Sequence, residues 1–122
     1  MLYLAGRFEA DDVLGVSVRG DTLAIFTDAI DSSTSPFVTR DRLERAVTTH
    51  ELGHLLGLVD LYLDDKRDDP EHPGHSTNRG SVMYWAVETS LVGQVLGGPP
   101  PVDFDRDDLS DLKRIHNGAS PA

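Results

Sequence analysis

The sequence HELGH at positions 50–54 is the feature that most constrains this chain. Two histidines four residues apart on a helix project from one face, close enough for both imidazoles to bind one tetrahedral zinc ion. Glu51 lies about 100° of helical rotation from His50 and can reach a water molecule in an open coordination position. The pentapeptide therefore predicts a helix that carries two metal ligands, His50 and His54, and a general base, Glu51.

Two residues beyond the pentapeptide extend the pattern. Gly57 permits the left-handed conformation with which a chain leaves a helix sharply and turns back. Three residues later, Asp60 can offer a carboxylate oxygen at about 2.0–2.2 Å from a zinc ion. We therefore expect Asp60 to be the third protein ligand, which leaves the fourth position open for water.

The remaining candidate ligands lie in a polar segment. The chain has no cysteine, so any metal must be held by nitrogen and oxygen atoms. His72 and His75 fall in residues 64–81, which are rich in Asp, Pro and Gly and predict an irregular loop. We expect both to be exposed loop histidines, because recruiting either costs more ordering entropy than recruiting Asp60. That one of them replaces or supplements Asp60 stays open.

With these residues in view, the pattern HExxHxxGxxD from His50 to Asp60 resembles the long zinc signature of the metzincin metallopeptidases. The variant with Asp as third ligand is shared by snapalysin-type enzymes. The resemblance implies one zinc ion per chain and hydrolysis of peptide bonds without a covalent intermediate. It also implies that Glu51 activates water and then donates its proton to the leaving amine.

A second segment strengthens the resemblance. Metzincins carry a methionine turn beneath the metal, and the sequence SVMY at 81–84 is similar to it. Met83 would then be a hydrophobic floor under the two histidine rings and not a ligand. Tyr84 directly after the methionine resembles the matrixin arrangement, in which the following residues help to form the specificity pocket. Tyr84 and Trp85 are therefore candidate pocket residues, and we assign no tyrosine ligand.

Apolar patterning predicts an α+β fold in a single domain spanning residues 1–122. We expect a small twisted mixed sheet packed on the active-site helix, in an upper part at 1–57. The lower part, 58–122, is mostly irregular, with the methionine turn and a final helix. The expected strands are 2–8, 13–18 and 22–27, the last two antiparallel, and a loop at 28–38 follows them.

Capping signals place the two helices. The first begins at Thr39 or Asp41, with Asp41 and Glu44 arranged like a capping box, and runs to about Leu56. The second runs roughly from residue 105 to 116, with Asp105 as its cap. Three apolar side chains give this second helix its expected buried face, namely Leu109, Leu112 and Ile115.

The segment at 13–27 also resembles the strand pair that precedes the metzincin active-site helix. Residues 14–18 would then be the edge strand on which an extended peptide substrate pairs. Only 49 residues precede His50, too few for the family's usual first strand, long helix and second strand. We therefore expect either a minimal metzincin or a core without its N-terminal part.

Charge and composition exclude some partners. The formal net charge of −10 and the absence of a Lys/Arg cluster argue against nucleic acid, whereas a peptide or protein substrate is expected. No apolar run reaches the length of a membrane span. Residues 1–7 lack the leader of a secretory signal peptide, so secreted and cytoplasmic locations both stay open.

Two other interpretations compete with a metzincin peptidase. The first is a zinc-containing peptide-binding or scaffold domain with little or no turnover, which the short N-terminal region favours because a substrate cleft needs an upper wall. The second is a gluzincin-type peptidase in which a downstream carboxylate, such as that of Glu88, is the third ligand. The absence of an obvious second ligand-bearing helix after His54 argues against it.

Overall fold

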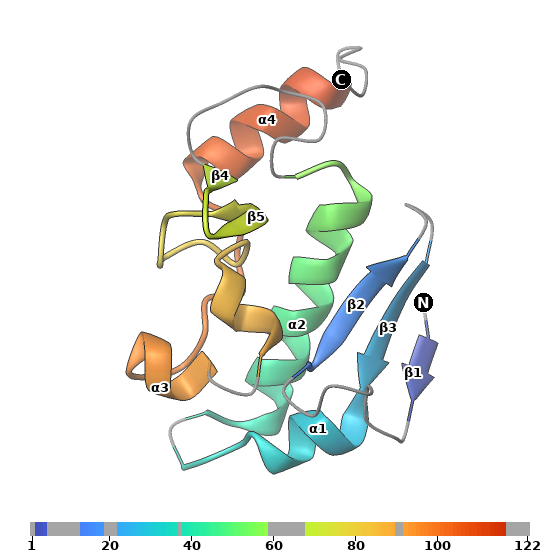
Figure 1. Ribbon diagram of the computed structural model, residues 1–122, viewed down its shortest axis with the longest axis vertical. Coiled ribbons are helices and arrows are strands. Elements are labelled where there is room, and N and C mark those ends of the chain that lie inside the picture. Colours follow the sequence, from blue (N-terminus) through green and yellow to red (C-terminus); the bar gives the residue numbers. More distant parts are fainter. Residues whose placement is uncertain are drawn as a thin grey trace.

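The computed structural model describes residues 2–4, 13–18, 22–36, 38–58, 68–89 and 92–116. Within these ranges the fold is α+β, and one long helix lies between a small sheet and an irregular half (Figure 1). No helix in the described ranges combines the length and the apolar character needed to cross a bilayer.

The sheet joins three strands in the order β1-β3-β2. β3 is parallel to β1 and antiparallel to β2, so the sheet is mixed as expected and β2 forms one edge. Gly15 pairs with Ile25 and Val18 with Thr22, which confirms the antiparallel pairing predicted from the sequence. The strands are β1 (Leu2–Leu4), β2 (Gly15–Val18) and β3 (Thr22–Phe26).

The segment after β3 differs from its prediction. Residues 28–38 are rich in Ser, Thr and Asp and were expected to form a loop, yet α1 (Thr27–Ser32) opens the segment. Its buried residues Ala29 and Ile30 join the core under the sheet. Burial of these two apolar side chains outweighs the turn-forming tendency of their polar neighbours.

The long helix is α2 (Arg40–Leu55), and Thr39 is its N-cap. The Thr39 hydroxyl accepts a hydrogen bond from the Arg42 backbone amide. The expected capping pair of Asp41 and Glu44 does not form, because the helix begins at Arg40 and Asp41 lies within its first turn. Glu44 is paired with Arg40 at 2.7 Å instead. Thr39 can cap without a carboxylate partner, since one hydroxyl suffices to satisfy an orphan amide.

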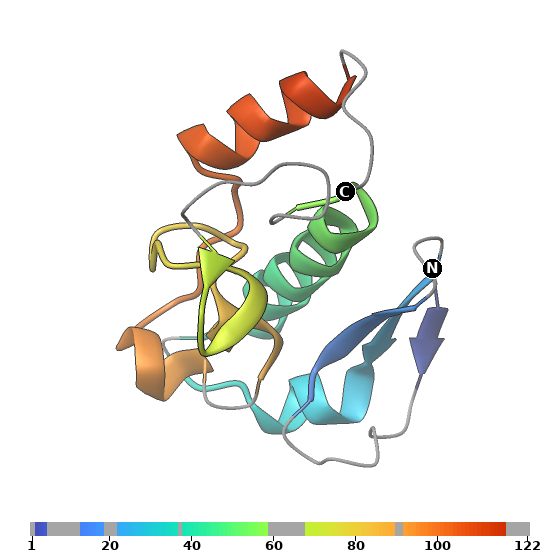
Figure 2. The same ribbon diagram turned by 45° about the horizontal axis from the view of Figure 1, so that its top comes forward.

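Two cores lie on opposite sides of α2. Leu43 and Val47 pack with the sheet and α1 in the first core, whereas Ala46 packs with the methionine segment in the second. Figure 2 shows α2 running between the blue sheet and the yellow and orange segments. Because both sides of the helix are covered, two of its polar side chains, those of His50 and Glu51, are fully buried.

The polar segment expected to be an irregular loop contains a hairpin instead. Its strands are β4 (Asp68–Asp69) and β5 (His72–Ser76), paired antiparallel with an irregularity in register. An Asp69 carboxylate oxygen accepts the Glu71 amide, which closes the turn between them. The pattern of apolar residues gives no sign of this hairpin. It is formed instead by the local side-chain hydrogen bond and by the left-handed backbone of Gly74, at φ +84°.

The C-terminal half contains the short elements η1 (Trp85–Glu88) and α3 (Val92–Leu96) and then α4 (Arg106–His116). Asp105 caps α4 as predicted, accepting the Asp108 amide at 2.7 Å. The predicted buried face is wrong at Leu109, which is 56% exposed. The helix is rotated so that Asp108 and Asp111 are buried instead, because the Asp108 carboxylate is hydrogen-bonded within the domain.

The packing of α2 on the second core gives a testable prediction. A Cβ added at Gly53 would overlap the Met83 sulfur and lie 3.1 Å from a Phe104 ring carbon. Gly53→Ala should therefore lower the free energy of unfolding by about 1–3 kcal/mol, the usual cost of overpacking. Urea denaturation measures this change. Gly98→Ala is the control, because a Cβ there meets nothing within 4 Å, and equal stability of the two variants would contradict the packing.

Candidate metal centre

The C-terminal turn of α2 positions the second histidine of the HELGH sequence. Gly57 has a φ of 98°, its amide bonds the His54 carbonyl, and the Leu58 amide bonds the Gly53 carbonyl. This is the Schellman arrangement of a helix that ends at a left-handed glycine. The turn brings the Leu58 carbonyl to 3.2 Å from Nδ1 of His54, so the helix exit predicted at Gly57 also orients a candidate ligand.

Each of three histidines has its Nδ1 atom against a backbone carbonyl. His50 Nδ1 lies 2.6 Å from the Val82 oxygen, and His75 Nδ1 lies 3.1 Å from the His72 oxygen. The His54 ring follows the same pattern through Leu58. A carbonyl can only accept a hydrogen bond, so each Nδ1 carries the proton and donates it. In the neutral imidazoles, each Nε2 is therefore left with its lone pair.

The three Nε2 atoms converge. His54 Nε2 lies 3.1 Å from His50 Nε2 and 3.3 Å from His75 Nε2. Zinc–nitrogen bonds of 2.0–2.1 Å place two ligand nitrogens of a tetrahedron about 3.3–3.4 Å apart. Burial, together with repulsion from the His50 and His75 rings, lowers the pKa of His54 to about 3. Lone pairs that face one another at these distances repel, and a cation held between them would make the contact favourable.

A carboxylate completes the group. Glu88, at the end of η1, places Oε2 at 3.1 Å from His50 Nε2 and Oε1 at 3.2 Å from His75 Nε2. Burial alone raises the pKa of Glu88, but the adjacent His50 and His75 rings outweigh burial and lower that pKa. The four ligand atoms lie within 4.8 Å of one another. His50, His54, His75 and Glu88 can therefore hold a metal ion.

Glu51 is fully buried beside this group. Its Oε1 accepts a hydrogen bond from the Ser17 hydroxyl at 3.2 Å, and the same hydroxyl lies 2.8 Å from the Glu51 backbone oxygen. Its Oε2 is buried and has no hydrogen-bond partner. Burial, followed by repulsion from the Glu88 carboxylate, raises the pKa of Glu51 to about 9. An orphaned carboxylate oxygen next to three convergent histidines fits a site that receives a cation and a water molecule.

The methionine segment is clamped to α4. Asp108, fully buried, accepts the Ser81 hydroxyl at 2.5 Å and the Asp105 amide at 2.9 Å. The Ser81 hydroxyl in turn accepts the Met83 amide at 2.9 Å. This chain of bonds fixes the turn that carries the Val82 carbonyl, which holds the His50 ring. The first turn of α4 therefore positions a candidate ligand without touching it.

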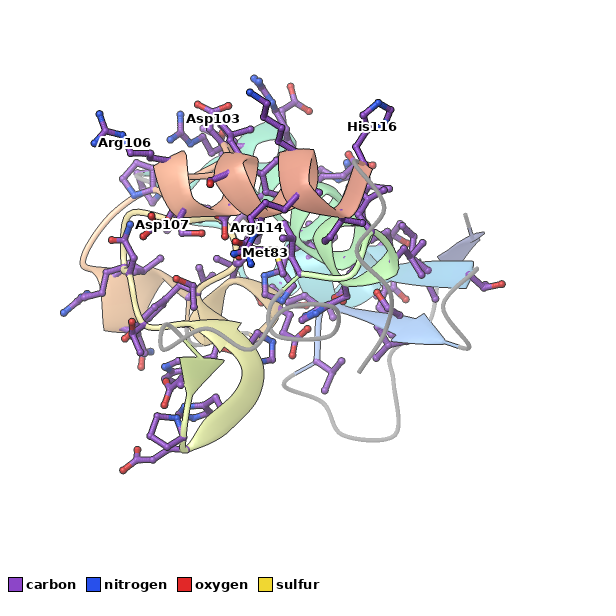
Figure 3. The ribbon with its side chains drawn as sticks, turned by 90° about the horizontal axis from the view of Figure 1, so that it is seen from above. Met83, Asp103, Arg106, Asp107, Arg114 and His116 are labelled. Carbon is purple, nitrogen blue, oxygen red and sulfur yellow. The ribbon has the colours of Figure 1, made fainter. Side chains whose placement is uncertain are left out.

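Met83 belongs to the second core, against which Leu112 of α4 packs. In the view from above it is drawn next to α4, whereas His116 points outward from the end of that helix (Figure 3). The Met83 side chain is fully buried and packs against Gly53 on α2. A floor role for Met83 under the histidine rings stays a prediction.

The expected pocket residues have other contacts. The Trp85 ring stacks on the His72 ring, with centroids 4.1 Å apart and planes inclined by 5°. Nδ1 of His72 lies 3.1 Å from an Asp69 carboxylate oxygen, which fixes that ring in turn. Tyr84 and Trp85 are both only partly buried, so they stay available to a ligand. His72 is not among the grouped ligands, but it is a half-buried residue of β5 and not the exposed loop histidine expected from the sequence.

Two expectations about the ligand set need comment. The structure differs from the sequence expectation at His75, because its side chain is only 13% exposed and its Nε2 joins the cluster. The β4–β5 hairpin fixes its backbone and so supplies the ordering that an irregular loop would lack. Asp60, the expected third ligand, lies outside the described residues. Glu88, considered as a ligand from the sequence, reaches the cluster from a 3-10 helix.

Comparison of the chain with protein-family models, with curated proteins and with solved structures finds no match.

The cluster predicts different effects for two neighbouring histidines. His75→Ala should weaken zinc binding by at least about 100-fold, since losses of even indirect ligand partners cost 10–100-fold. His72→Ala should change it by only a few-fold, because the backbone oxygen that holds His75 remains. Competition with a chromogenic chelator measures both affinities. Similar affinities for the two variants would remove His75 from the ligand set.

The clamp on the methionine segment makes a second prediction. Asp108→Ala leaves the Ser81 hydroxyl and the Asp105 amide without their acceptor and should lower the free energy of unfolding by about 1–3 kcal/mol. Asp107→Ala removes the same charge from the same helical turn but at an exposed position, and it should cost less than about 1 kcal/mol. Chemical denaturation compares the two. If Asp107→Ala is as damaging as Asp108→Ala, the loss comes from the helix dipole and not from the clamp.

Proposed function

We propose that the chain is a zinc-dependent endopeptidase of metzincin type, which hydrolyses peptide bonds with Glu51 as general base. The observation that carries the proposal is the convergence of three histidine Nε2 atoms next to a buried glutamate with an unpartnered oxygen. Catalytic zinc sites have three protein ligands, three histidines being one of the known sets, and leave the fourth position to water or substrate.

His50, His54 and His75 would hold the zinc ion. The bound ion supplies Lewis-acid chemistry, which polarises a carbonyl group and lowers the pKa of water to about 7. Its positive charge also favours the ionised form of a neighbouring carboxylate, which offsets the burial of Glu51. The Nδ1 hydrogen bonds to backbone carbonyls fix the orientation of each ring and make its Nε2 more basic, and so a better ligand for the metal ion.

Glu51 would carry the proton. Its Oε1 is held by Ser17, so its unpartnered Oε2 keeps one orientation. That oxygen takes a proton from the attacking water and returns it to the leaving amine. Ser17 belongs to β2, so the base is oriented by the edge strand of the sheet.

The same edge strand would receive the substrate. β2 has β3 on one side, and because the preceding Leu14 amide already bonds Glu88, an extended peptide would pair along Gly15–Val18 and gain main-chain hydrogen bonds there. Because Ser17 connects β2 to Glu51, a peptide on this strand lies close to the proposed base. Tyr84 and Trp85, partly buried on the opposite segment, would contact its side chains.

The role of Glu51 can be separated from metal binding. Glu51→Gln should retain zinc while peptide hydrolysis falls by about 100-fold or more, the usual contribution of a general base. Cleavage of a mixed peptide library, followed by mass spectrometry with a chelator control, measures activity, and elemental analysis measures zinc. Glu44→Gln on the same helix is the matched control, since Glu44 pairs with Arg40 away from the cluster. Undiminished hydrolysis by Glu51→Gln would show that another group is the base.

One observation favours a second candidate function. Glu88 brings the number of grouped ligands to four, and zinc sites with four protein ligands are usually structural. The chain would then be a zinc-containing peptide-binding or scaffold domain with little or no turnover. Peptides that bind without being cleaved, with zinc retained, would favour this candidate over the peptidase.

A further inference from the structure

The peptidase mechanism makes no use of the Glu88 carboxylate, although it faces the centre of the cluster. One of its oxygens lies 3.1 Å from His50 Nε2 and the other lies 3.2 Å from His75 Nε2. Both of these rings already donate through Nδ1 to backbone carbonyls. The carboxylate therefore faces the same point between the rings as the lone pairs of the three Nε2 atoms.

The backbone of Glu88 is fixed to the sheet. Its carbonyl accepts the Leu14 amide at 2.7 Å, and the next residue, Thr89, forms a bridge with Val13. On its other side, Val87 is fully buried in the second core. The main chain at this point is held from both sides, so any motion of Glu88 is confined to its side chain.

Among the four grouped ligands, Glu88 is the most exposed. Its side chain is 26% exposed, compared with 20% for His54, 13% for His75 and 0% for His50. The described residues give this carboxylate no Lys or Arg partner within ion-pair distance, only the histidines. A glutamate side chain with three rotatable bonds, open to solvent on one side, can leave the cluster without moving its backbone.

We propose that Glu88 is a displaceable fourth ligand that keeps the zinc site latent. Its carboxylate occupies the fourth coordination position, which catalysis requires to be open. Rotation of the side chain into solvent opens that position, whereas the three histidines remain. This inference rests on the proposed function for its consequence, latency, but the ligand itself can be tested without any activity.

The test uses the chain loaded with Co²⁺, whose visible absorption reports the number and type of ligands. Glu88→Ala and Glu88→Gln should both change the spectrum, because the carboxylate leaves the coordination shell. Each variant should also bind acetohydroxamic acid at least about 10-fold more tightly than the parent, since no ligand has to be displaced first. Glu71→Ala, which removes an exposed glutamate from the β4–β5 turn, should match the parent in both measurements.

The outcomes separate this proposal from the peptidase proposal. Altered spectra, tighter hydroxamate binding and faster peptide hydrolysis in the Glu88 variants support both. Altered spectra and tighter binding without hydrolysis by any variant support the displaceable ligand but reject the peptidase. Spectra and hydroxamate affinity equal to those of the parent overturn the proposal. Loss of Co²⁺ from both variants also overturns it, because Glu88 would then be an essential ligand.

Discussion

The donation of each Nδ1 proton to a backbone carbonyl is the interaction on which the site depends. Carbonyls accept and never donate, so this arrangement settles the tautomer of three imidazoles together. It leaves Nε2 of His54 3.1 Å from that of His50 and 3.3 Å from that of His75, so a cation held among these lone pairs would be stabilised. The three carbonyls come from different elements: the exit of α2, the start of β5 and the methionine turn. The fold therefore orients these three histidine rings through main-chain carbonyls.

The position of α2 between two cores explains how charged groups come to be buried there. If only one side of the helix were covered, His50 and Glu51 would lie at the edge of the buried face, in contact with solvent. In this fold the sheet covers one side and the methionine segment covers the other, so both side chains have 0% exposure. Desolvation then raises the pKa of Glu51 and lowers the pKa of the neighbouring His54.

The sequence predicts local features of the site well because they follow from helical periodicity. The spacing of His50 and His54, the end of the helix at Gly57 and the antiparallel strand pair are each set within a few residues. The third histidine is different, because His75 reaches the cluster only through a hairpin closed by Asp69, which apolar patterning does not reveal. The rotation of α4, which exposes Leu109, likewise depends on the Asp108–Ser81 hydrogen bond between distant segments. Long-range polar contacts of this kind carry no periodic signal.

The grouped ligands come from three segments that are far apart along the chain. His54 and His75 are separated by 21 residues, and His50 and Glu88 by 38. An ion at their centre would close two loops at once and so would reduce the entropy of the unfolded chain, as a cross-link does. The sequence has no cysteine with which to form a disulfide. A bound metal ion would thus serve the chemistry and would also stabilise this small domain as a cross-link between distant segments.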